Sequence, residues 1–239
     1  MTLTNIRFFK SNNIDELNVA LWNAIYSKGQ PIEFGSVGEP KTAKEIFAVV
    51  QLYGKALNDL YEGKLPKGWK FGEAANKVYV EMLKDPEKGE QPYTYGQRLH
   101  KYPDHPYGEH TFNQIDSVTG NLRHSIQNKI QTNRIVGILW HPYDLTREDP
   151  PCFNWFQLRL TEKNKVSLRT LFRSRDFGNA SFANWGAIIR CFVDEVINPA
   201  GGELEELICV STSAHIYEND MDMVESLIGK IPEHVRRMM

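Results

Sequence analysis

Apolar residues recur along the chain with two different periods, and each period predicts one kind of element. Spacings of three and four residues predict a helix that follows the capping run Ser11–Asn13 and ends near Gly29, and further helices over residues 74–84, 111–127, 182–197 and 218–228. Short β-branched and aromatic runs predict strands over residues 46–53, 135–140, 153–160, 166–172 and 207–210. Residues 30–42 are expected to form a strand and then a mobile loop, and the Pro- and Tyr-rich residues 86–108 a long ordered loop or lid.

The order of these elements predicts the fold class. Helices and strands are mixed without regular βαβ units, internal repeats or a low-complexity linker. This favours a single α/β domain of the α+β type over residues 1–239, with a mixed or antiparallel sheet. The polar turn 162–165 is expected to join two of the strands as a hairpin. Trp140 and Trp155 are interpreted as core aromatics, and residues 135–140 as a buried strand.

Composition narrows the class of protein. The chain has 239 residues, of which 41% are hydrophobic, enough for a packed core. The formal net charge is −2 with interspersed charges, so no basic stripe favours nucleic acid. Three widely spaced cysteines argue against a disulfide framework. A signal-peptide layout and an apolar run of about 18 residues are both missing, so we expect a soluble cytoplasmic protein without a membrane partner.

Candidate chemistry centres on Cys152, which follows two prolines and opens an apolar run. A nearby guanidinium favours the thiolate, and Arg173 and Arg175 are the local candidates. If residues 153–160 pair with 166–173, the hairpin returns Arg173 to the end where Cys152 lies. Arg173 could also hold a phosphate by paired hydrogen bonds, with Ser174 adding another. Asn184 offers a donor and an acceptor, which can match the amide edge of a pyrimidine.

Each of these residues also has a purely structural interpretation. A lone cysteine at a strand start is more often a small buried hydrophobe than a nucleophile. The run 173–176 could be a solvated turn, and His215 and Tyr217 could be half-buried positions of one strand. Cys191 and Cys209 lie in apolar runs and are expected to be inert. The order and spacing of the candidates together favour a site.

That order resembles thymidylate synthase and the related pyrimidine nucleotide hydroxymethylases. The matching motifs are Tyr93-Thr94-Tyr95-Gly96-Gln97-Arg98-Leu99, Gln114-Ile115-Asp116, Arg134–Trp140, Pro150-Pro151-Cys152, Phe156-Gln157, Arg173-Ser174-Arg175-Asp176, Asn184 and His215-Ile216-Tyr217. The likeness covers residues 93–228 and is greatest to the compact, archaeal-type branch, whereas residues 1–92 diverge. It implies a thymidylate synthase-like fold with a large mixed sheet flanked by helices, and a homodimer that packs sheet against sheet.

The resemblance also implies a reaction and roles. Cys152 would add to C6 of deoxyuridylate (dUMP), so that C5 captures a one-carbon unit from 5,10-methylenetetrahydrofolate or a tetrahydromethanopterin-type analogue. Substrate-binding roles would fall to Arg173, Ser174, Asp176, Gln157, Asn184, His215 and Tyr217, and to Arg134 reaching across the dimer. Tyr95 would help to remove the C5 proton. Glu81, or alternatively Glu73, would be the general acid or base.

Several positions depart from the family pattern. Asn133-Arg134 stands where two adjacent arginines are usual, and Phe153 stands where His often follows the nucleophile. Lys41 and Lys44 are the candidates for a missing N-terminal arginine, and the end of the chain, 236–239, does not resemble the usual closing tail. The resemblance also bears on the base, because family members that use uracil carry Asn at the position of Asn184 and the deoxycytidylate hydroxymethylases carry Asp. An amide can donate and accept a hydrogen bond, whereas an ionised carboxylate only accepts, so Asn184 favours uracil over cytosine.

Three alternatives stay open. The enzyme could be a hydroxymethylase acting on dUMP, dCMP or CMP with the same nucleophile, or a nucleotide-binding relative without catalysis. Third, the motifs could match by accident in an ordinary soluble domain. A metal site of His100, His105 and His110, which recur every five residues, is disfavoured because no cysteine or close acidic cluster accompanies them.

Overall fold

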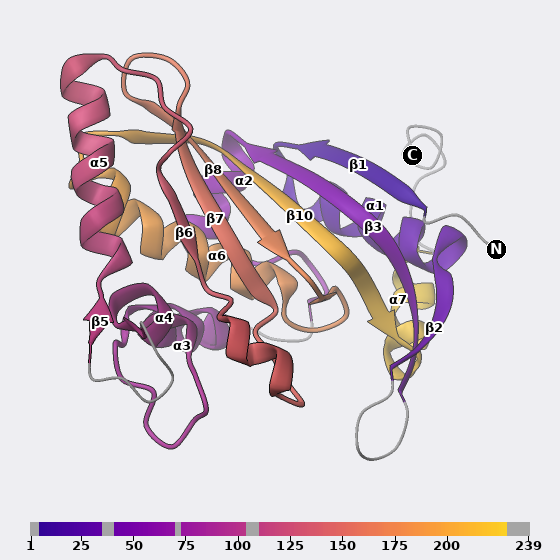
Figure 1. The fold of residues 1–239 in the computed structure, drawn as a ribbon. Coiled ribbons are helices and arrows are strands. Elements are labelled where there is room, and N and C mark those ends of the chain that lie inside the picture. The colour runs from indigo at the N-terminus through magenta and orange to yellow at the C-terminus, as the bar shows by residue number, and fades with distance from the viewer. Residues whose placement is uncertain (1–4, 35–40, 70–72, 104–109, 229–239) are drawn as a thin grey trace.

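An eight-stranded sheet organises the chain (Figure 1). The structure is a computed structural model that describes residues 5–34, 41–69, 73–103 and 110–228. The strand order is β1-β3-β10-β8-β7-β6, with β2 added on β3 and β9 on β10. The strands are β1 (Ile6–Ser11), β2 (Gln30–Phe34), β3 (Lys41–Tyr53), β6 (Val136–Ile138), β7 (Phe153–Leu160), β8 (Lys165–Phe172), β9 (Arg175–Asp176) and β10 (Glu203–Tyr217), while β4 (Tyr102–Pro103) and β5 (Thr111–Phe112) pair separately.

The sheet is mixed, as predicted. β1 runs parallel to β3, and β8 and β9 run parallel to β10, whereas the remaining neighbours are antiparallel. The predicted strand 46–53 is the C-terminal part of the longer strand β3, and 207–210 lies within the longer strand β10. The predicted hairpin is β7–β8, with Phe153 opposite Phe172 and Leu160 opposite Val166. The loop expected at the end of 30–42 falls on residues 35–40, outside the described residues.

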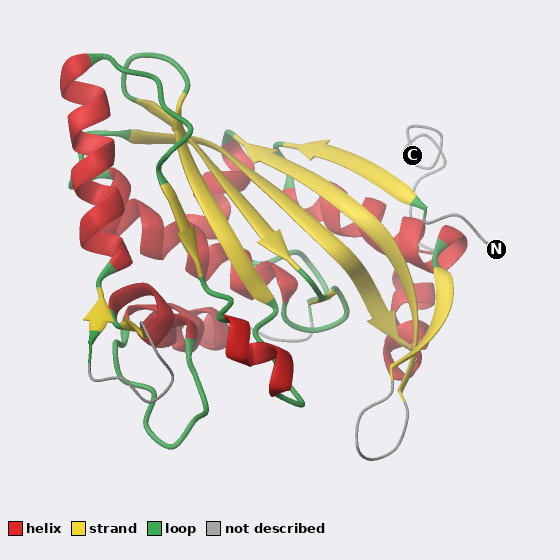
Figure 2. Ribbon diagram, viewed as in Figure 1, coloured by secondary structure: helices red, strands yellow, loops and turns green. Residues whose placement is uncertain are grey.

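Helices flank the sheet and confirm most of the helical pattern (Figure 2). They are α1 (Ile14–Lys28), α2 (Lys55–Tyr61), α3 (Glu73–Lys84), α4 (Tyr95–His100), α5 (Gln114–Asn128), α6 (Ser181–Phe192) and α7 (Met221–Ile228). Asn13 caps α1, because its side chain accepts hydrogen bonds from the amides of Asp15 and Glu16. A π-helical turn, Val193–Ile197, extends α6 to the predicted end at residue 197. Sequence reasoning missed β1, α2 and α4, and the two-residue strands β4, β5 and β9.

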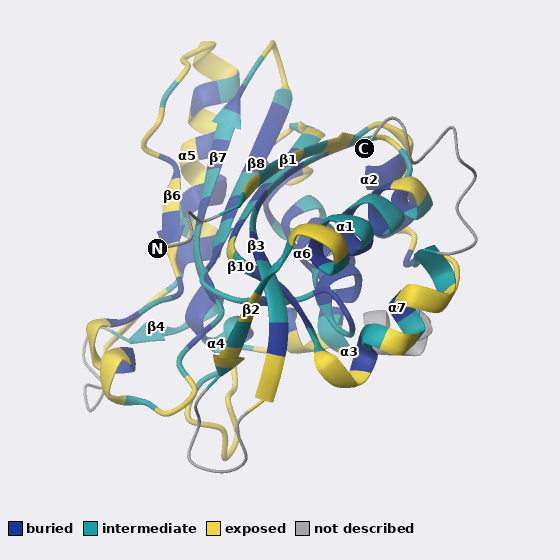
Figure 3. Ribbon diagram, turned by 90° about the vertical axis from the view of Figure 1, so that its right-hand side faces the viewer, coloured by how far each residue is buried: buried dark blue, intermediate teal, exposed yellow. Residues whose placement is uncertain are grey.

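The hydrophobic core lies between the helices and one face of the sheet (Figure 3). Its largest fully buried side chains include Trp22 of α1, Trp185 of α6 and Phe156 of β7. Alternate residues of β3 and β10 are buried, as a strand with one covered face requires. Within the described residues, no helix is long and apolar enough to cross a membrane.

The opposite face of the sheet carries an apolar row that no described helix covers. The strand register aligns one residue from each of six strands across this face: Phe8, Val49, Val210, Leu171, Trp155 and Ile138. Phe8 is 78% exposed and Ile138 45% exposed. We name these six residues the outer row. An uncovered apolar row of this length is typical of a surface that packs against a partner.

The predictions that Trp155 and Trp140 are core aromatics were both wrong. Trp155 belongs to the outer row rather than to the core, and Trp140 is also only half-buried. The segment predicted as a buried strand is the edge strand β6, in which Gly137 is buried while Val136 and Ile138 are exposed. The apolar run 135–140 therefore belongs to an edge strand with one buried and one exposed face, and not to a strand that is buried on both faces.

Gly137 provides a test of the register between β6 and β7. It lies opposite Phe156, and a Cβ at this position would overlap the buried Phe156 ring. We expect Gly137→Ala to lower the free energy of unfolding by about 1–3 kcal/mol, measured by urea denaturation. The control is Gly120→Ala in α5, where a Cβ meets nothing within 4 Å. That variant should gain about 0.5–1 kcal/mol. Equal stability of the two variants would contradict the register.

Candidate functional site

Cys152 lies half-buried where the loop after the 3₁₀ helix Pro142–Thr146 enters β7. Pairing of Phe153 with Phe172 brings the next residue, Arg173, beside it. The amide of Arg173 donates to the carbonyl oxygen of Cys152 at 2.9 Å. The hairpin prediction is therefore confirmed at the residue on which the chemical hypothesis depends.

The guanidinium of Arg173 holds the segment before Cys152. Its Nε donates to the carbonyl of Pro151 at 3.2 Å, and its Nη2 donates to the carbonyl of Pro150 at 2.6 Å. Nη2 also lies 3.4 Å from the exposed carboxylate of Asp149. Because prolines keep their carbonyl acceptors while lacking an N–H, this segment offers acceptors without competing donors. Arg173 thus clamps the loop that carries Cys152.

Burial and charge act on the Cys152 thiol in opposite directions. Burial raises the pKa of Cys152 above its ordinary value, and the positive charges of Arg173 and Arg175 lower it. Asp149 adds a smaller upward effect. The arginines lower the pKa of Cys152, as expected, but burial outweighs them and the net direction is upward. The arginines offset part of the cost of burying an anionic sulfur.

Tyr95 joins α4 to the start of β7. Its Oη accepts hydrogen bonds from the amides of Cys152 and Phe153, both at 3.2 Å. The ring packs edge-on against Phe153, with ring centroids 5.8 Å apart. Burial raises the pKa of Tyr95 far above its ordinary value, so the phenol is protonated at neutral pH. Since both amides are donors, the Tyr95 proton is left to point toward another acceptor.

A bulge in β10 takes the next two site residues, both half-buried, out of the sheet ladder. β8 ends at Phe172 and β9 resumes at Arg175, while the register of β10 shifts between Ser211 and Ala214. Arg173 and Ser174 therefore leave the ladder, and Thr212 Oγ1 donates to the Arg173 carbonyl at 2.7 Å. Bulges beside sites commonly redirect side chains in this way.

Asp176 shapes the turn from β9 into α6. Its carboxylate accepts from the Gly178 amide at 2.8 Å and from Asn179 Nδ2 at 2.9 Å. Its carbonyl accepts from Ser181 Oγ at 2.6 Å. Asn184 follows in the first turn of α6 and is half-buried, and its side-chain amide bonds to none of the described residues. The turn therefore leaves that amide available.

His215 and Tyr217 lie near the end of β10, with ring centroids 4.8 Å apart. His215 pairs with Asp176 across the sheet and is only 2% exposed. The Lys41 ammonium lies 5.5 Å from the ring centroid of Tyr217. Lys44 instead donates to the carbonyl of Tyr26 in α1 at 2.8 Å. Of the two lysine candidates, only Lys41 reaches this group.

The structure does not bring every predicted residue to Cys152. Gln157 lies five residues along β7, about 16 Å away at ordinary strand spacing, and donates to the carbonyl of Asn133 at 2.8 Å. Arg134 is exposed next to the edge strand β6. Glu81 is exposed on α3, on the helix side away from buried Val80 and Leu83. The alternative, Glu73, begins that helix.

Two tyrosines near the site were not predicted from sequence. Tyr79 of α3 lies close enough to Asp176 for its carboxylate to raise the Tyr79 pKa, after the larger effect of burial. Burial raises the pKa of Tyr93 to about 12, with smaller effects of Asp149 and Cys152. The sequence could have indicated Tyr79, because helical periodicity places it on the same face of α3 as Val80 and Leu83. For Tyr93 the only sequence signal is its place in the motif Tyr93–Leu99.

His100 and the other two cysteines lie away from Cys152, in structural surroundings. His100 Nε2 lies 3.3 Å from Glu195, His110 is exposed, and His105 is outside the described residues. No metal-binding group of three His, Cys, Asp or Glu side chains gathers in the described ranges. Cys191 and Cys209 are fully buried. A separate hollow of about 710 Å³ lies between β1 and α1, and no predicted site residue lines it.

Comparison with known proteins covers nearly the whole chain. The family model for thymidylate synthase matches residues 5–239. A protein of Methanosarcina acetivorans named "Putative thymidylate synthase" is 27% identical over 227 residues, which cover 94% of this chain and 96% of the relative. A protein with the same name from Methanosarcina barkeri is 30% identical over 72% of this chain and 75% of the relative. Another from Methanopyrus kandleri is 31% identical over 66% of this chain and 70% of the relative.

His215 gives a pH test of the site. Burial lowers its pKa, Asp176 and Glu45 partly oppose this, and Arg173 adds to it. The folded state therefore binds this proton more weakly than the unfolded state, and stability falls as pH drops below about 6.5. We expect His215→Gln to flatten this slope in urea unfolding between about pH 5 and 8. His124→Gln, at an exposed histidine of α5, should keep the wild-type slope. A wild-type slope in His215→Gln would contradict the buried, neutral imidazole.

Proposed function

The chain belongs to the thymidylate synthase family, and on that premise we propose that it methylates C5 of dUMP to give dTMP, with Cys152 as the nucleophile. The observation that carries this proposal is the contact between the Arg173 amide and the Cys152 carbonyl, together with the bonds of the Arg173 guanidinium to the two prolines before the thiol. The family makes the protein a transferase, and the finer choice of reaction and substrate is the proposal.

Nucleotide binding would begin at the bulge. The Arg173 guanidinium and the Ser174 hydroxyl leave the ladder together, and a 5′-phosphate offers more and better acceptors than the carbonyls of Pro150 and Pro151. Arg173 would then exchange part of its clamp for the phosphate. This exchange would free the loop at the moment when Cys152 needs to approach the pyrimidine ring.

The base and sugar would be recognised by neutral groups. The half-buried amide of Asn184 can donate to a carbonyl and accept from an N–H, as the uracil edge requires. His215 is neutral near pH 7, because burial lowers its pKa, so its ring presents one donor and one acceptor. Together with Tyr217 it would hold the sugar 3′-hydroxyl. Asp176 would support the ring region from the turn into α6.

The chemistry would use the thiol first. The Cys152 thiolate would add to C6 of the ring, and the electron pair of the C5–C6 double bond would move to C5, which would bond to the one-carbon unit. Loss of the C5 proton would break the bond from that unit to the pterin nitrogen and leave a methylene group on C5. Hydride transfer to this methylene would give the methyl group and expel the Cys152 sulfur from C6. The folate-type cosubstrate of the family would supply that unit and, in a synthase, the reducing hydride. Tyr95, held protonated beside the Cys152 amide, would help to transfer the C5 proton through water. The exposed side chain of Glu81 gives no support to its predicted role as general acid or base.

A second copy of the chain would complete the site. The outer row presents six aligned apolar residues, and a second outer row is the surface that matches it in a sheet-against-sheet dimer. Arg134 is exposed beside β6, at the margin of this face. In such a dimer Arg134 would reach the partner's phosphate. Asn133 cannot add a second charge, which leaves Lys41 as the supplementary cation.

Tritium release tests the proposed reaction. With dUMP labelled at C5 and a methylene-carrying reduced pterin, we expect release of the label and formation of dTMP. Cys152→Ala should lower the rate by at least about 10³-fold, because the nucleophile is lost. Cys191→Ser, at a buried cysteine outside the site, should keep activity.

The products separate the alternatives. A 5-hydroxymethyl product without oxidised pterin would replace the synthase by a hydroxymethylase, and release from dCMP alone would overturn the choice of uracil. No release from either nucleotide would leave a binding protein and refute the enzyme.

The dimer has its own test. Val49→Asp places a charge in the middle of the outer row, and we expect it to convert a dimer into a monomer in size-exclusion chromatography with light scattering. Val78→Asp makes the same change on the exposed surface of α3, where Val78 is 55% exposed, and should leave the mass unchanged. A wild-type monomer, or a dimer in Val49→Asp, would contradict the proposed interface.

A further inference from the structure

A second arginine lies behind the nucleophile, inside the core. Arg175 of β9 is only 3% exposed, and no carboxylate in the described residues forms an ion pair with it. Its Nη2 donates to the carbonyl of Ser181 at 2.8 Å, and its Nη1 lies 3.1 Å from the sulfur of Cys209. Its Nε is buried without a partner. A buried guanidinium without a counter-charge is costly, so its retention calls for a reason.

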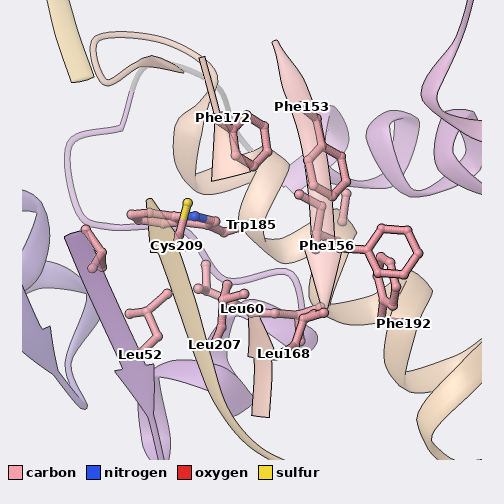
Figure 4. Packing of buried hydrophobic residues seen from close by; sticks show 14 of the residues in the cluster. Leu52, Leu60, Phe153, Phe156, Leu168, Phe172, Trp185, Phe192, Leu207 and Cys209 are labelled. Atoms are coloured by element: carbon pink, nitrogen blue, oxygen red, sulfur yellow. The ribbon is translucent and has the colours of Figure 1, made fainter. Parts of the chain in front are cut away.

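Aromatic rings link this guanidinium to the nucleophile's strand. Arg175 lies 4.1 Å from the ring centroid of Phe172 and 4.6 Å from that of Trp185. Phe172 in turn stacks on Phe153, with centroids 4.7 Å apart and planes 6° from parallel. Figure 4 shows Phe153 and Phe172 side by side. Arg175, Phe172 and Phe153 therefore form one stack that ends at the residue after Cys152.

The charges around Cys152 are arranged on two sides. Arg173 and the opposing Asp149 lie on the exposed side, whereas Arg175 lies in the core. Both guanidinium groups lower the pKa of Cys152, against the upward effect of burial and of Asp149. The phenols of Tyr93, Tyr95 and Tyr217 also lie within electrostatic range of the sulfur, and all three are neutral at pH 7 because their pKa values are raised.

We propose that Arg175 is a positioning residue for the nucleophile, whose buried positive charge stabilises the anionic sulfur of Cys152 from the core side of the sheet. This inference rests on the proposed role of Cys152 as the nucleophile. A phosphate bound by Arg173 would neutralise the charge on the exposed side. Arg175 is shielded from substrate, so its charge would continue to support the thiolate after the nucleotide has bound. Arg173 would thus bind the phosphate while Arg175 stabilises the thiolate, two tasks that a single arginine could not perform together.

The test measures alkylation of Cys152 by iodoacetamide as a function of pH, with the Cys152 peptide followed by mass spectrometry. Only the thiolate reacts, so the rate follows the thiolate fraction. For Arg175→Met we expect a rate at pH 7 that is about three- to tenfold lower, which corresponds to a pKa rise of half to one unit. Met can fill the space between Phe172 and Trp185 with favourable sulfur–aromatic contacts, so the melting temperature should stay close to that of the wild type.

Three controls separate charge from packing. Arg175→Lys keeps the charge and should move the pH profile back toward the wild type. Cys209→Ser removes the sulfur beside Arg175 and should leave the profile of Cys152 unchanged. Arg175→Gln is neutral and keeps an amide donor for the Ser181 carbonyl, so it answers the same question if Arg175→Met does not fold.

Salt distinguishes the two arginines. Arg173 is 35% exposed on its side chain, so the effect of Arg173→Met should shrink in about 1 M KCl, where the screening length is about 3 Å. The effect of Arg175→Met should persist, because its charge is buried. A wild-type pH profile in a folded neutral variant, or loss of the difference in salt, would overturn the proposal. Alkylation needs no turnover, so an inactive protein with a shifted profile would refute the proposed function, while the electrostatic effect of Arg175 on the Cys152 sulfur would stand.

Discussion

The site depends on one register, that of the β7–β8 hairpin. Pairing of Phe153 with Phe172 puts the Arg173 amide on the Cys152 carbonyl, and the Arg173 side chain then holds the carbonyls of Pro150 and Pro151. A slip by one residue would turn the Arg173 side chain to the other face of the sheet. The loop before β7 would then lose its clamp.

The second constraint is the balance between burial and charge at Cys152. A thiol that is shielded from water resists ionisation, and the positive charges of Arg173 and Arg175 reduce this resistance from opposite sides. The β10 bulge keeps one of these arginines accessible, while the stack on Phe172 keeps the other in the core. The same strand segment therefore provides one partly exposed guanidinium and one that is enclosed in the core.

The sequence predicts well what is local. A polar turn between two strand patterns is enough to place Arg173 beside Cys152, because hairpin pairing follows from adjacency in the chain. The exposure of Glu81 could also have been predicted from the sequence, because Val80 and Leu83 define the buried face of the helix. The distance of Gln157 from the thiol follows from strand rise alone.

What failed depends on contacts between distant segments. Trp155 and Phe156 are adjacent and equally apolar, and only the position of the helices decides which of them faces the core. β1 pairs in parallel with β3, a connection that local pattern cannot reveal. The isolated guanidinium of Arg175 depends on Trp185 and Cys209, which come from α6 and β10.

The most direct test of the account is a crystal structure of the protein with bound dUMP. It should show the Cys152 sulfur about 3–3.5 Å from C6 of the pyrimidine, the phosphate on Arg173 and Ser174, and the amide of Asn184 on the uracil edge. A sulfur turned into the core, or a nucleotide bound away from the β10 bulge, would contradict the assignment of Cys152 as the nucleophile.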